Sequence, residues 1–146
     1  MEGKQTRVFA RAFVCPRGAS PEDSKRLLAG ANPGSLVQAV KEGLIGNEVF
    51  VELLSAQTLQ AQSSGGLLAN KPEIDFILRL AGTTQISRAI VDAGAKSGDK
   101  FVLVVAGRST VRRPRGLDGV ELPRLKLTDS ELERVEKAAL LNVERA

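Results

Sequence analysis

The chain has 146 residues, of which 42% are hydrophobic and 26% charged, with a formal net charge of +4. This length and balance predict one domain, residues 1–146, that can bury a core without disulfides or metal ions. Histidine is absent and Cys15 is the single cysteine, which excludes a histidine base, an internal disulfide and a cysteine–histidine zinc site. We see no apolar run of 18 residues and no signal-peptide core, so we expect a cytoplasmic protein without a membrane span.

The first predicted element is a strand over residues 7–14, where the side chains alternate with period two. One face would carry Val8, Ala10, Ala12 and Val14, and the other Arg7, Phe9, Arg11 and Phe13. A loop follows, and a short helix is expected over residues 21–29.

The next segments show weaker patterns. Residues 34–42 predict a helix with the apolar side Leu36, Val37 and Val40, ended by Gly43. Residues 48–54 (EVFVELL) are rich in β-forming types and predict a second strand. Residues 55–70 are expected to be helical at both ends, with Gly65 and Gly66 weakening the middle.

Residues 70–94 contain two strong helical patterns separated by a break at Gly82. The first helix begins near Pro72 and would face the core with Ile74, Ile77, Leu78 and Ala81. Phe76 and Leu80, four residues apart, give it a second apolar side. A helix that is apolar over more than one face is either central in the fold or carries a partner surface.

The second helix of this pair is expected to be capped by Thr83 or Thr84 and to end at Gly94. Its inward residues would be Ile86, Ala89, Ile90 and Ala93. Gln85 lies beside the break between the two helices.

The C-terminal third begins with a continuous apolar run over residues 100–107, typical of a central strand covered on both faces. A basic turn region follows, and then one short edge strand limited by Pro123 is expected. Thr128 and Glu131 form a capping box for a closing helix, with the inward residues Leu132, Val135, Ala139 and Leu140. Helices and strands in this order predict the α/β (α+β) class.

The spacing of the charged residues bears on both catalysis and nucleic-acid binding. The pairs Glu73/Asp75 and Glu131/Glu133 are two residues apart, so on a helix they would point in different directions and form no catalytic dyad. Cations gather in a loop containing Arg108, Arg112, Arg113 and Arg115 and around the helix pair at Lys71, Arg79 and Arg88. A phosphate-binding surface and a solvated basic surface both agree with this distribution.

The central forty residues have a more specific likeness. Glu73, Ile74, Leu78, Leu80, a short break, Gln85, Ile86, Ser87, Ala89 and Ile90, then a glycine and an apolar strand, match the pattern of one family. In this order they resemble the small kinase-binding subunit of the KEOPS complex, the PRPK-binding protein family. The likeness runs from about Phe9 to the C-terminal helix and suits an archaeal member, whereas the residues around Ser63–Gly66 and the arginine-rich loop match poorly.

The resemblance implies a domain with a central mixed or antiparallel sheet flanked by helices. It implies a subunit that is not an enzyme and needs no cofactor or metal. Such a subunit binds and stimulates the small atypical kinase/ATPase of KEOPS and helps to hold the 3′ CCA end of tRNA for threonylcarbamoyladenosine modification. We therefore predict kinase contacts at Phe76, Leu80 or exposed apolar residues of neighbouring helices. For tRNA we predict contacts at Lys71, Arg79, Gln85 and Arg88, in preference to the arginine-rich loop.

Two other functions stay open from the sequence alone. One is a small hydrolase or transferase that uses Cys15 or an acidic residue. The other is a kinase adaptor that makes no contact with RNA.

Overall fold

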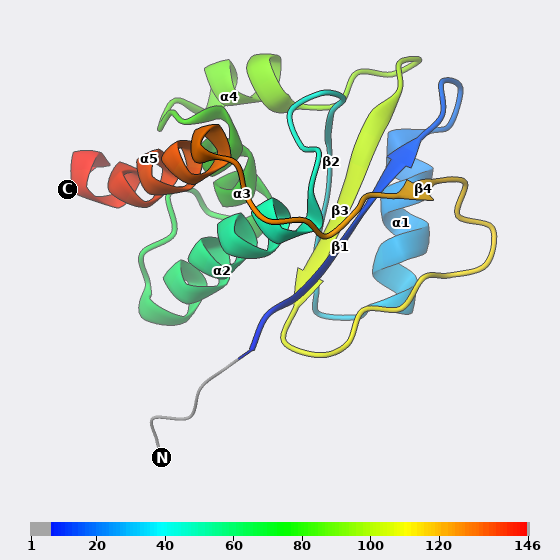
Figure 1. Cartoon of the computed structure of the whole chain (residues 1–146), viewed down its shortest axis with the longest axis horizontal. Helices are drawn as coiled ribbons and strands as arrows, with labels where there is room; N and C mark the ends of the chain where they lie inside the picture. The colour runs from blue at the N-terminus through cyan, green and yellow to red at the C-terminus, as the bar shows by residue number, and fades with distance from the viewer. Residues whose placement is uncertain (1–6, 146) are drawn as a thin grey trace.

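The computed structural model describes residues 7–145, with the backbone alone at Arg145. Within that range, four strands form an antiparallel sheet in the order β2-β3-β1-β4: β1 (Phe9–Cys15), β2 (Leu36–Lys41), β3 (Phe101–Gly107) and β4 (Val120–Glu121). The helices are α1 (Pro21–Ala31), α2 (Glu48–Ser64), α3 (Pro72–Ala81), α4 (Ile86–Ala93) and α5 (Asp129–Arg145). Helix α1 covers one face of the sheet and α2–α5 lie on the other (Figure 1). The predicted α/β (α+β) class is confirmed, and the sheet is antiparallel rather than mixed.

Strands β1 and β3 follow their sequence predictions. All seven residues of β3 are buried, and β3 pairs with β2 on one side and β1 on the other, as expected of a central strand. In β1, Ala10 and Ala12 face the helices α2–α5, whereas Phe9 and Phe13 face α1. The period-two pattern therefore assigned both faces of β1 correctly.

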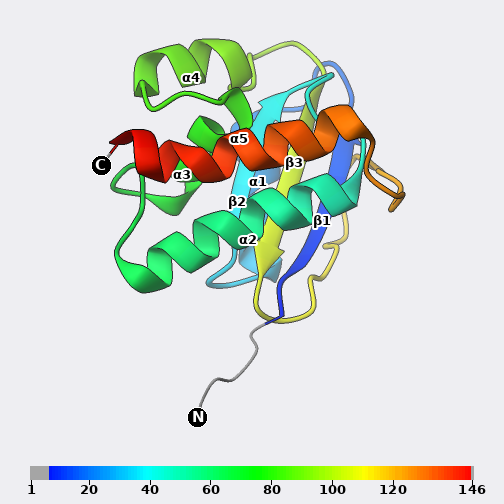
Figure 2. The same cartoon turned by 60° about the vertical axis from the view of Figure 1, so that its left-hand side comes forward.

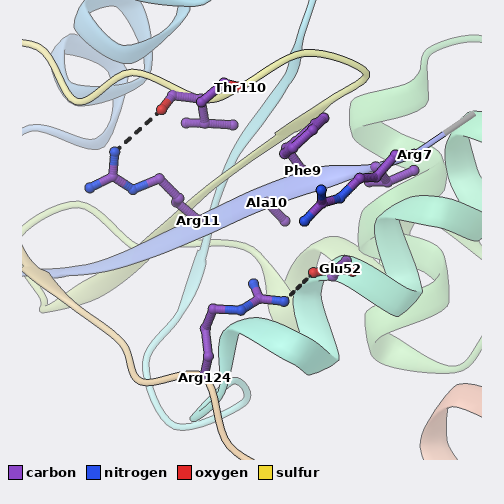
Figure 3. A pocket seen from close by; sticks show the side chains of 9 residues that line it. Arg7, Phe9, Ala10, Arg11, Glu52, Thr110 and Arg124 are labelled. Atoms are coloured by element: carbon purple, nitrogen blue, oxygen red, sulfur yellow. Dashed lines mark hydrogen bonds and ion pairs between the residues drawn. The ribbon is translucent and has the colours of Figure 1, made fainter.

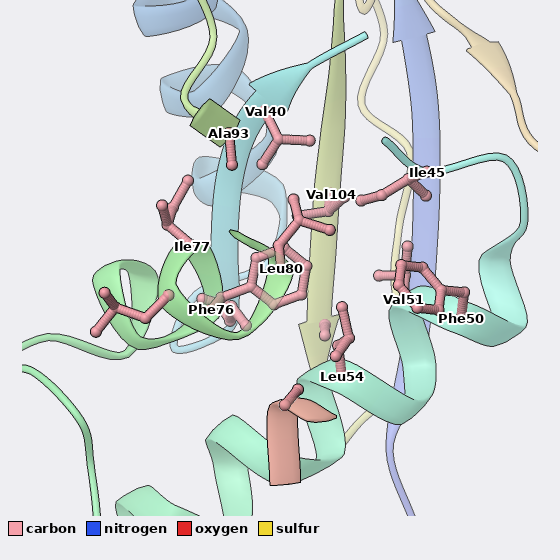
Figure 4. Close-up of a cluster of buried hydrophobic side chains, with 14 of the residues drawn as sticks. Val40, Ile45, Phe50, Val51, Leu54, Phe76, Ile77, Leu80, Ala93 and Val104 are labelled. Atoms are coloured by element: carbon pink, nitrogen blue, oxygen red, sulfur yellow. The ribbon is translucent and has the colours of Figure 1, made fainter. Parts of the chain in front are cut away.

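The sheet separates two hydrophobic cores. The larger core lies between the sheet and α2, α3, α4 and α5, and Figure 4 shows its centre. The smaller core lies between the opposite face, α1 and the segment that follows β3. Helix α5 does not pack directly on the sheet; it lies across α2 and α3 in a further layer, as Figure 2 shows.

The helix predicted over residues 34–42 is wrong, because this segment forms strand β2. Residues Leu36 to Val40 are all buried, and β2 pairs with β3 from Leu36↔Ala106 to Lys41↔Phe101. A short, fully buried apolar segment has no periodicity that separates a helix from a strand. Gly43, expected as a helix cap, has φ of +94° in the turn after the strand.

The strand predicted over residues 48–54 is also wrong, because it forms the first two turns of α2. The side chain of Asn47 accepts a hydrogen bond from the Val49 N–H at 3.0 Å, which caps the helix. The helix continues to Ser64 and ends at Gly65, whose φ of +79° suits a C-terminal cap. The cap from Asn47 and the burial of side chains at helical spacing outweigh the β-propensity of these residues.

The remaining helices begin close to the predicted positions. Helix α3 starts at Pro72 and ends at Gly82, and the capping box of α5 is present, with the Glu131 N–H donating to Thr128 Oγ1 at 3.1 Å. Helix α4 begins one or two residues later than expected: Gln85, not Thr83 or Thr84, is its N-cap residue. None of the helices in residues 7–145 combines the length and apolar character needed to cross a membrane.

Candidate partner-binding surfaces

Helix α3 is central, and this decides between the two interpretations of its apolar character. It packs against β2, α2, α4 and α5. Phe76 is 0% exposed and Leu80 is 6% exposed, and both belong to the larger core (Figure 4). The structure therefore does not offer these two predicted kinase contacts at the surface, because other helices cover the second apolar side of α3.

Arg79 also lies inside the protein, where it forms an ion pair with Asp75 of the same helix. Its Nε donates to Asp75 Oδ1 at 2.6 Å and its Nη2 to Asp75 Oδ2 at 3.1 Å. The guanidinium also donates to the Ala138 carbonyl oxygen and to Asn142 Oδ1 on α5.

Asp75 completes this network on its other side. It accepts hydrogen bonds from Thr58 Oγ1 of α2 and from the Leu68 N–H. The Asp75–Arg79 pair thus joins α2, α3 and α5 in the interior. An RNA phosphate cannot reach Arg79 in this conformation, so the prediction of a tRNA contact there is corrected to a structural role.

Lys71, Gln85 and Arg88 are exposed, but they do not form one cluster. Lys71 is the N-cap residue of α3 and Gln85 follows the end of this helix, so the two residues lie near its opposite ends. Arg88 lies on α4 and forms an exposed ion pair with Asp92, at 3.5 Å. The structure therefore brings Gln85 and Arg88 onto one helix end and leaves Lys71 at the other end of α3.

A further cation approaches the break between α3 and α4. The side chain of Lys137 on α5 lies against Gly82, with its Cε 3.3 Å from the position that a Cβ would occupy there. Lys137 is exposed and stands 55 residues away from Gly82 in sequence, so no local pattern could have placed it there. We call Gln85 and Arg88, at the start of α4, and Lys137, beside the preceding break at Gly82, the basic rim of α4.

Helix α4 exposes large apolar side chains next to this rim. Only Ala89 and Ala93 of its four predicted inward residues are buried, whereas Ile86 and Ile90 are about half exposed, and Val91 is more so. The small alanines allow α4 to approach α3 and β2 closely, and the bulkier side chains are left at the border with solvent.

Helix α5 exposes a longer apolar face. Of its predicted inward residues, Leu132, Ala139 and Leu140 are exposed and Val135 is half-buried. Ala138 and Leu141 are the buried residues instead. The helix is held to α2 by a hydrogen bond from the Gln57 side chain to the Val135 carbonyl oxygen.

The exposed apolar residues of α5 lie on one side of the helix. At about 100° per residue, Leu132, Leu140 and Val143 fall within about 80° of one another. Including Ala139 widens the sector to about 100°, and two exposed acidic residues, Asp129 and Glu136, lie within it. We call the set Ala139, Leu132, Leu140 and Val143 the outer face of α5.

Cys15 lies in an environment that does not suit a nucleophile. It is fully buried in the smaller core, and this burial raises the pKa of its thiol to about 11. The neighbouring Arg113 acts in the opposite direction but does not offset the loss of hydration. The thiol is therefore protonated at neutral pH.

The acid pair that the fold does create was missed by sequence analysis. Glu48 of α2 is 2% exposed and accepts a hydrogen bond from the Ala12 N–H at 2.9 Å. Burial, together with a hydrogen bond to Glu121, raises the pKa of Glu48 to about 7, while Arg11 holds the pKa of Glu121 low. These carboxyls are 73 residues apart in sequence. Within residues 7–145 no three acidic, cysteine or histidine side chains gather in a way that could hold a metal ion.

The arginine-rich loop is partly structural. Arg113 donates to the carbonyl oxygens of Leu117 and Gly119 and lies over the Phe13 ring. The backbone of Arg112 is held by both polar ends of the buried Asn32 side chain. The side chains of Arg108, Arg112 and Arg115 remain exposed.

Comparisons of this chain with protein-family models and with curated proteins found no match.

Proposed function

We propose that this chain is a non-catalytic, cytoplasmic subunit of a KEOPS-type complex. It binds and stimulates the small atypical kinase/ATPase and helps to recruit the 3′ CCA end of tRNA for threonylcarbamoyladenosine modification. The observation that carries the proposal is the outer face of α5, an apolar surface that the fold leaves uncovered. The family resemblance of the central segment supplies the kind of partner.

The outer face of α5 suits a protein partner better than α3 does. Leu140 and Val143 are 56% and 70% exposed, so a partner can cover them without any rearrangement of the core. Apolar residues grouped on one exposed helix face are the usual anchors of a protein interface. Kinase binding is therefore assigned to this face in place of Phe76 and Leu80.

The start of α4 suits the end of an RNA strand. Unpaired bases are recognised by apolar or aromatic surfaces and by hydrogen bonds to their edges. Ile86 offers an aliphatic surface, and the Gln85 side chain can both donate to and accept from a base edge. Arg88 and Lys137 provide the positive charge that a phosphate backbone requires.

The RNA part of this proposal is tested by comparing intact tRNA with tRNA that lacks its 3′ terminal nucleotides. The account predicts weaker binding of the trimmed tRNA, measured at one fixed salt concentration. Equal affinities would remove the acceptor-end proposal and favour a kinase adaptor without RNA contact.

The kinase part is tested separately by the ATPase rate of the cognate kinase with and without this chain. We expect stimulation, and we expect Cys15→Ser to leave it unchanged. A large loss of complex activity from Cys15→Ser would support the alternative of an enzyme that uses this thiol. The buried, protonated state of Cys15 disfavours that alternative.

A further inference from the structure

A second surface lies at the edge of the sheet, where β4 covers only part of strand β1. Strand β4 is only two residues long and pairs with Phe13 and Val14, near the end of β1. One more hydrogen bond, from the Leu122 N–H to the Ala12 carbonyl oxygen, extends this pairing. Beyond that point, no described strand lies on this side of residues 8–10, whereas β3 pairs with Phe9 and Ala10 on the other side.

The main-chain N–H and C=O groups of β1 that do not pair with β3 point towards this open edge. Ala12 directs both its N–H and its C=O away from β3, to Glu48 and Leu122 respectively. In an antiparallel ladder, successive residues alternate between the two sides of a strand. Ala10, two residues before Ala12, therefore directs its N–H and C=O to the same side, and so does Val8.

A cavity of about 320 Å³ lies along this edge. Its walls come from both sides of the sheet plane: Glu52 of α2 and Arg124 on one side, and Thr110 and Val111 on the other, as Figure 3 shows for the labelled residues. An extended chain placed in the plane of the sheet would run between these walls. We call this site the β1 slot; its lining residues are Arg7, Val8, Phe9, Ala10, Arg11, Glu52, Thr110, Val111 and Arg124.

The β1 slot is positively charged, since three arginines and one glutamate line it. Arg11 is occupied by Glu121, to which it donates from Nε and Nη2, and by the Val111 carbonyl oxygen. Arg124 uses Nη2 to contact Glu52, and Arg7 lies over the Phe9 ring, 4.6 Å from its centre. A guanidinium has five N–H donors, so Arg7 and Arg124 can each bind an additional carboxylate.

We propose that the β1 slot binds an extended acidic peptide segment of a partner protein, which adds to the sheet as a strand beside residues 8–10. Free N–H and C=O groups that repeat every second residue match the hydrogen-bonding pattern of a peptide backbone. A nucleic acid has no such repeat, which is why a peptide is favoured over RNA at this site. The carboxylates of the peptide would contact Arg7 and Arg124. This inference does not rest on the proposed function.

The test uses a fluorescein-labelled peptide of alternating short acidic and valine runs, Ser-Glu-Val-Glu-Glu-Val-Glu-Ser, titrated with the full chain and followed by anisotropy. We expect saturable binding. Ala10→Pro removes the edge N–H and places the proline ring in the slot, but it leaves the ladder to β3 intact because that N–H does not point to β3. We expect it to weaken binding about tenfold or more, the loss of a hydrogen bond together with a steric clash.

Charge is tested with two variants matched in kind. Arg124→Glu and Arg26→Glu each reverse an arginine that forms a surface ion pair, with Glu52 and Asp23 respectively, and each changes the net charge equally. Arg26 lies on α1, outside the slot. We expect Arg124→Glu to weaken peptide binding about tenfold and Arg26→Glu to change it by less than about twofold. Because both sites are exposed, this pair keeps the test decisive if Ala10→Pro does not fold.

Three results would overturn the proposal. One is the absence of saturable peptide binding to the unmodified chain. The second is equal weakening by Arg26→Glu and Arg124→Glu, which indicates attraction by net charge alone. The third is displacement of the peptide by a single-stranded RNA oligonucleotide at a lower concentration than by the unlabelled peptide, which indicates a nucleic-acid site.

Discussion

Helices α3 and α5 lie against each other, yet they distribute polar and apolar residues in opposite ways. Helix α3 buries an aspartate and an arginine in its middle, while its apolar side chains fill the larger core. Helix α5 turns Ala138 and Leu141 inward and leaves Leu132, Leu140 and Val143 exposed. The helix with the stronger apolar character is therefore the structural one, and the more polar helix presents the uncovered apolar face.

This difference teaches that a surplus of apolar residues on a helix does not identify an interface by itself. Helix α3 is surrounded by α2, α4, α5 and β2, so it has room for a second apolar side and even for a paired charge. Helix α5 is in the outermost layer, so any apolar residue beyond the narrow strip that touches α2 and α3 is left exposed. Position in the layers, not composition, separates core from surface.

The largest expected effect is on the buried charge of α3. Arg79→Ala leaves Asp75 buried without its cationic partner, and breaking such a pair costs about 3–5 kcal/mol. Chemical denaturation should show this loss in the free energy of unfolding. Arg88→Ala on α4 is the control: it removes one partner of an exposed pair, which contributes about 0–1 kcal/mol. Similar effects of the two substitutions would contradict the structural role of Arg79.

Glu48 is a second buried acid, but within the described residues 7–145 it forms no ion pair like that of Asp75 with Arg79. Its contribution to stability therefore depends on pH. Its pKa is raised from 4.5 to about 7, so the folded state binds this proton more tightly than the unfolded state. Stability from this group is therefore fully present below pH 4.5 and lost as the pH rises through 7, by at most about 1.4 kcal/mol per pH unit.

Glu48→Gln keeps an oxygen acceptor for the Ala12 N–H and removes the titration. We expect the free energy of unfolding, measured between pH 5 and 8, to fall less with pH in this variant than in the unmodified chain. Glu121, whose pKa is lowered, loses its contribution only as the pH falls below 4.5, outside this window. An unchanged slope in the variant would show that Glu48 does not titrate there.

At the start of α4, a substitution is expected to change the affinity for RNA rather than the stability of the fold. If Arg88 contacts a phosphate of the single-stranded acceptor end, Arg88→Ala should reduce the slope of log affinity against log salt by about 0.7. Arg113→Ala should change this slope less, because the Arg113 guanidinium is engaged with backbone carbonyl oxygens. Filter binding over a salt series measures both slopes. A larger change from Arg113→Ala would move the RNA site to the arginine-rich loop.

The smallest expected effect is that of Leu140→Glu on stability. Leu140→Glu replaces a side chain that is 56% exposed, so the free energy of unfolding should change by less than about 1 kcal/mol. Leu141→Ala, one residue further along, removes a fully buried side chain and should cost about 2–5 kcal/mol. Thermal or chemical unfolding of the two variants therefore checks which side of α5 is the outer one.

The sequence predicted a helix or strand correctly where the pattern that specifies it lies within a few neighbouring residues. The alternation in β1, the buried run of β3, Pro72 at the start of α3 and the capping box of Thr128 and Glu131 all predicted their elements. Strand β2 was predicted to be a helix, and the start of α2 was predicted to be a strand. Both predictions were wrong because a short apolar segment fits either structure until its neighbours are known. There, pairing with β3 and the cap from Asn47 decided the outcome.

The candidate sites depended even more on distant contacts. Arg79 appeared as an available cation because its partners beyond Asp75 come from α5, about sixty residues later. Lys137 and the Glu48–Glu121 pair escaped notice for the same reason. Periodicity gives the sides of a helix, but only the layer around it shows which side a partner can reach.

Isothermal titration calorimetry with the cognate kinase tests the central claim most directly. A double substitution, Leu140→Glu with Val143→Glu, places charge on the outer face of α5, and Leu125→Glu is the control at an apolar residue of similar exposure, 59% against 56% for Leu140. The account predicts that the double variant loses more than about 2 kcal/mol of binding, roughly thirtyfold in affinity, while the control binds as the unmodified chain does. Unchanged kinase binding by a folded double variant would contradict the assignment of this face.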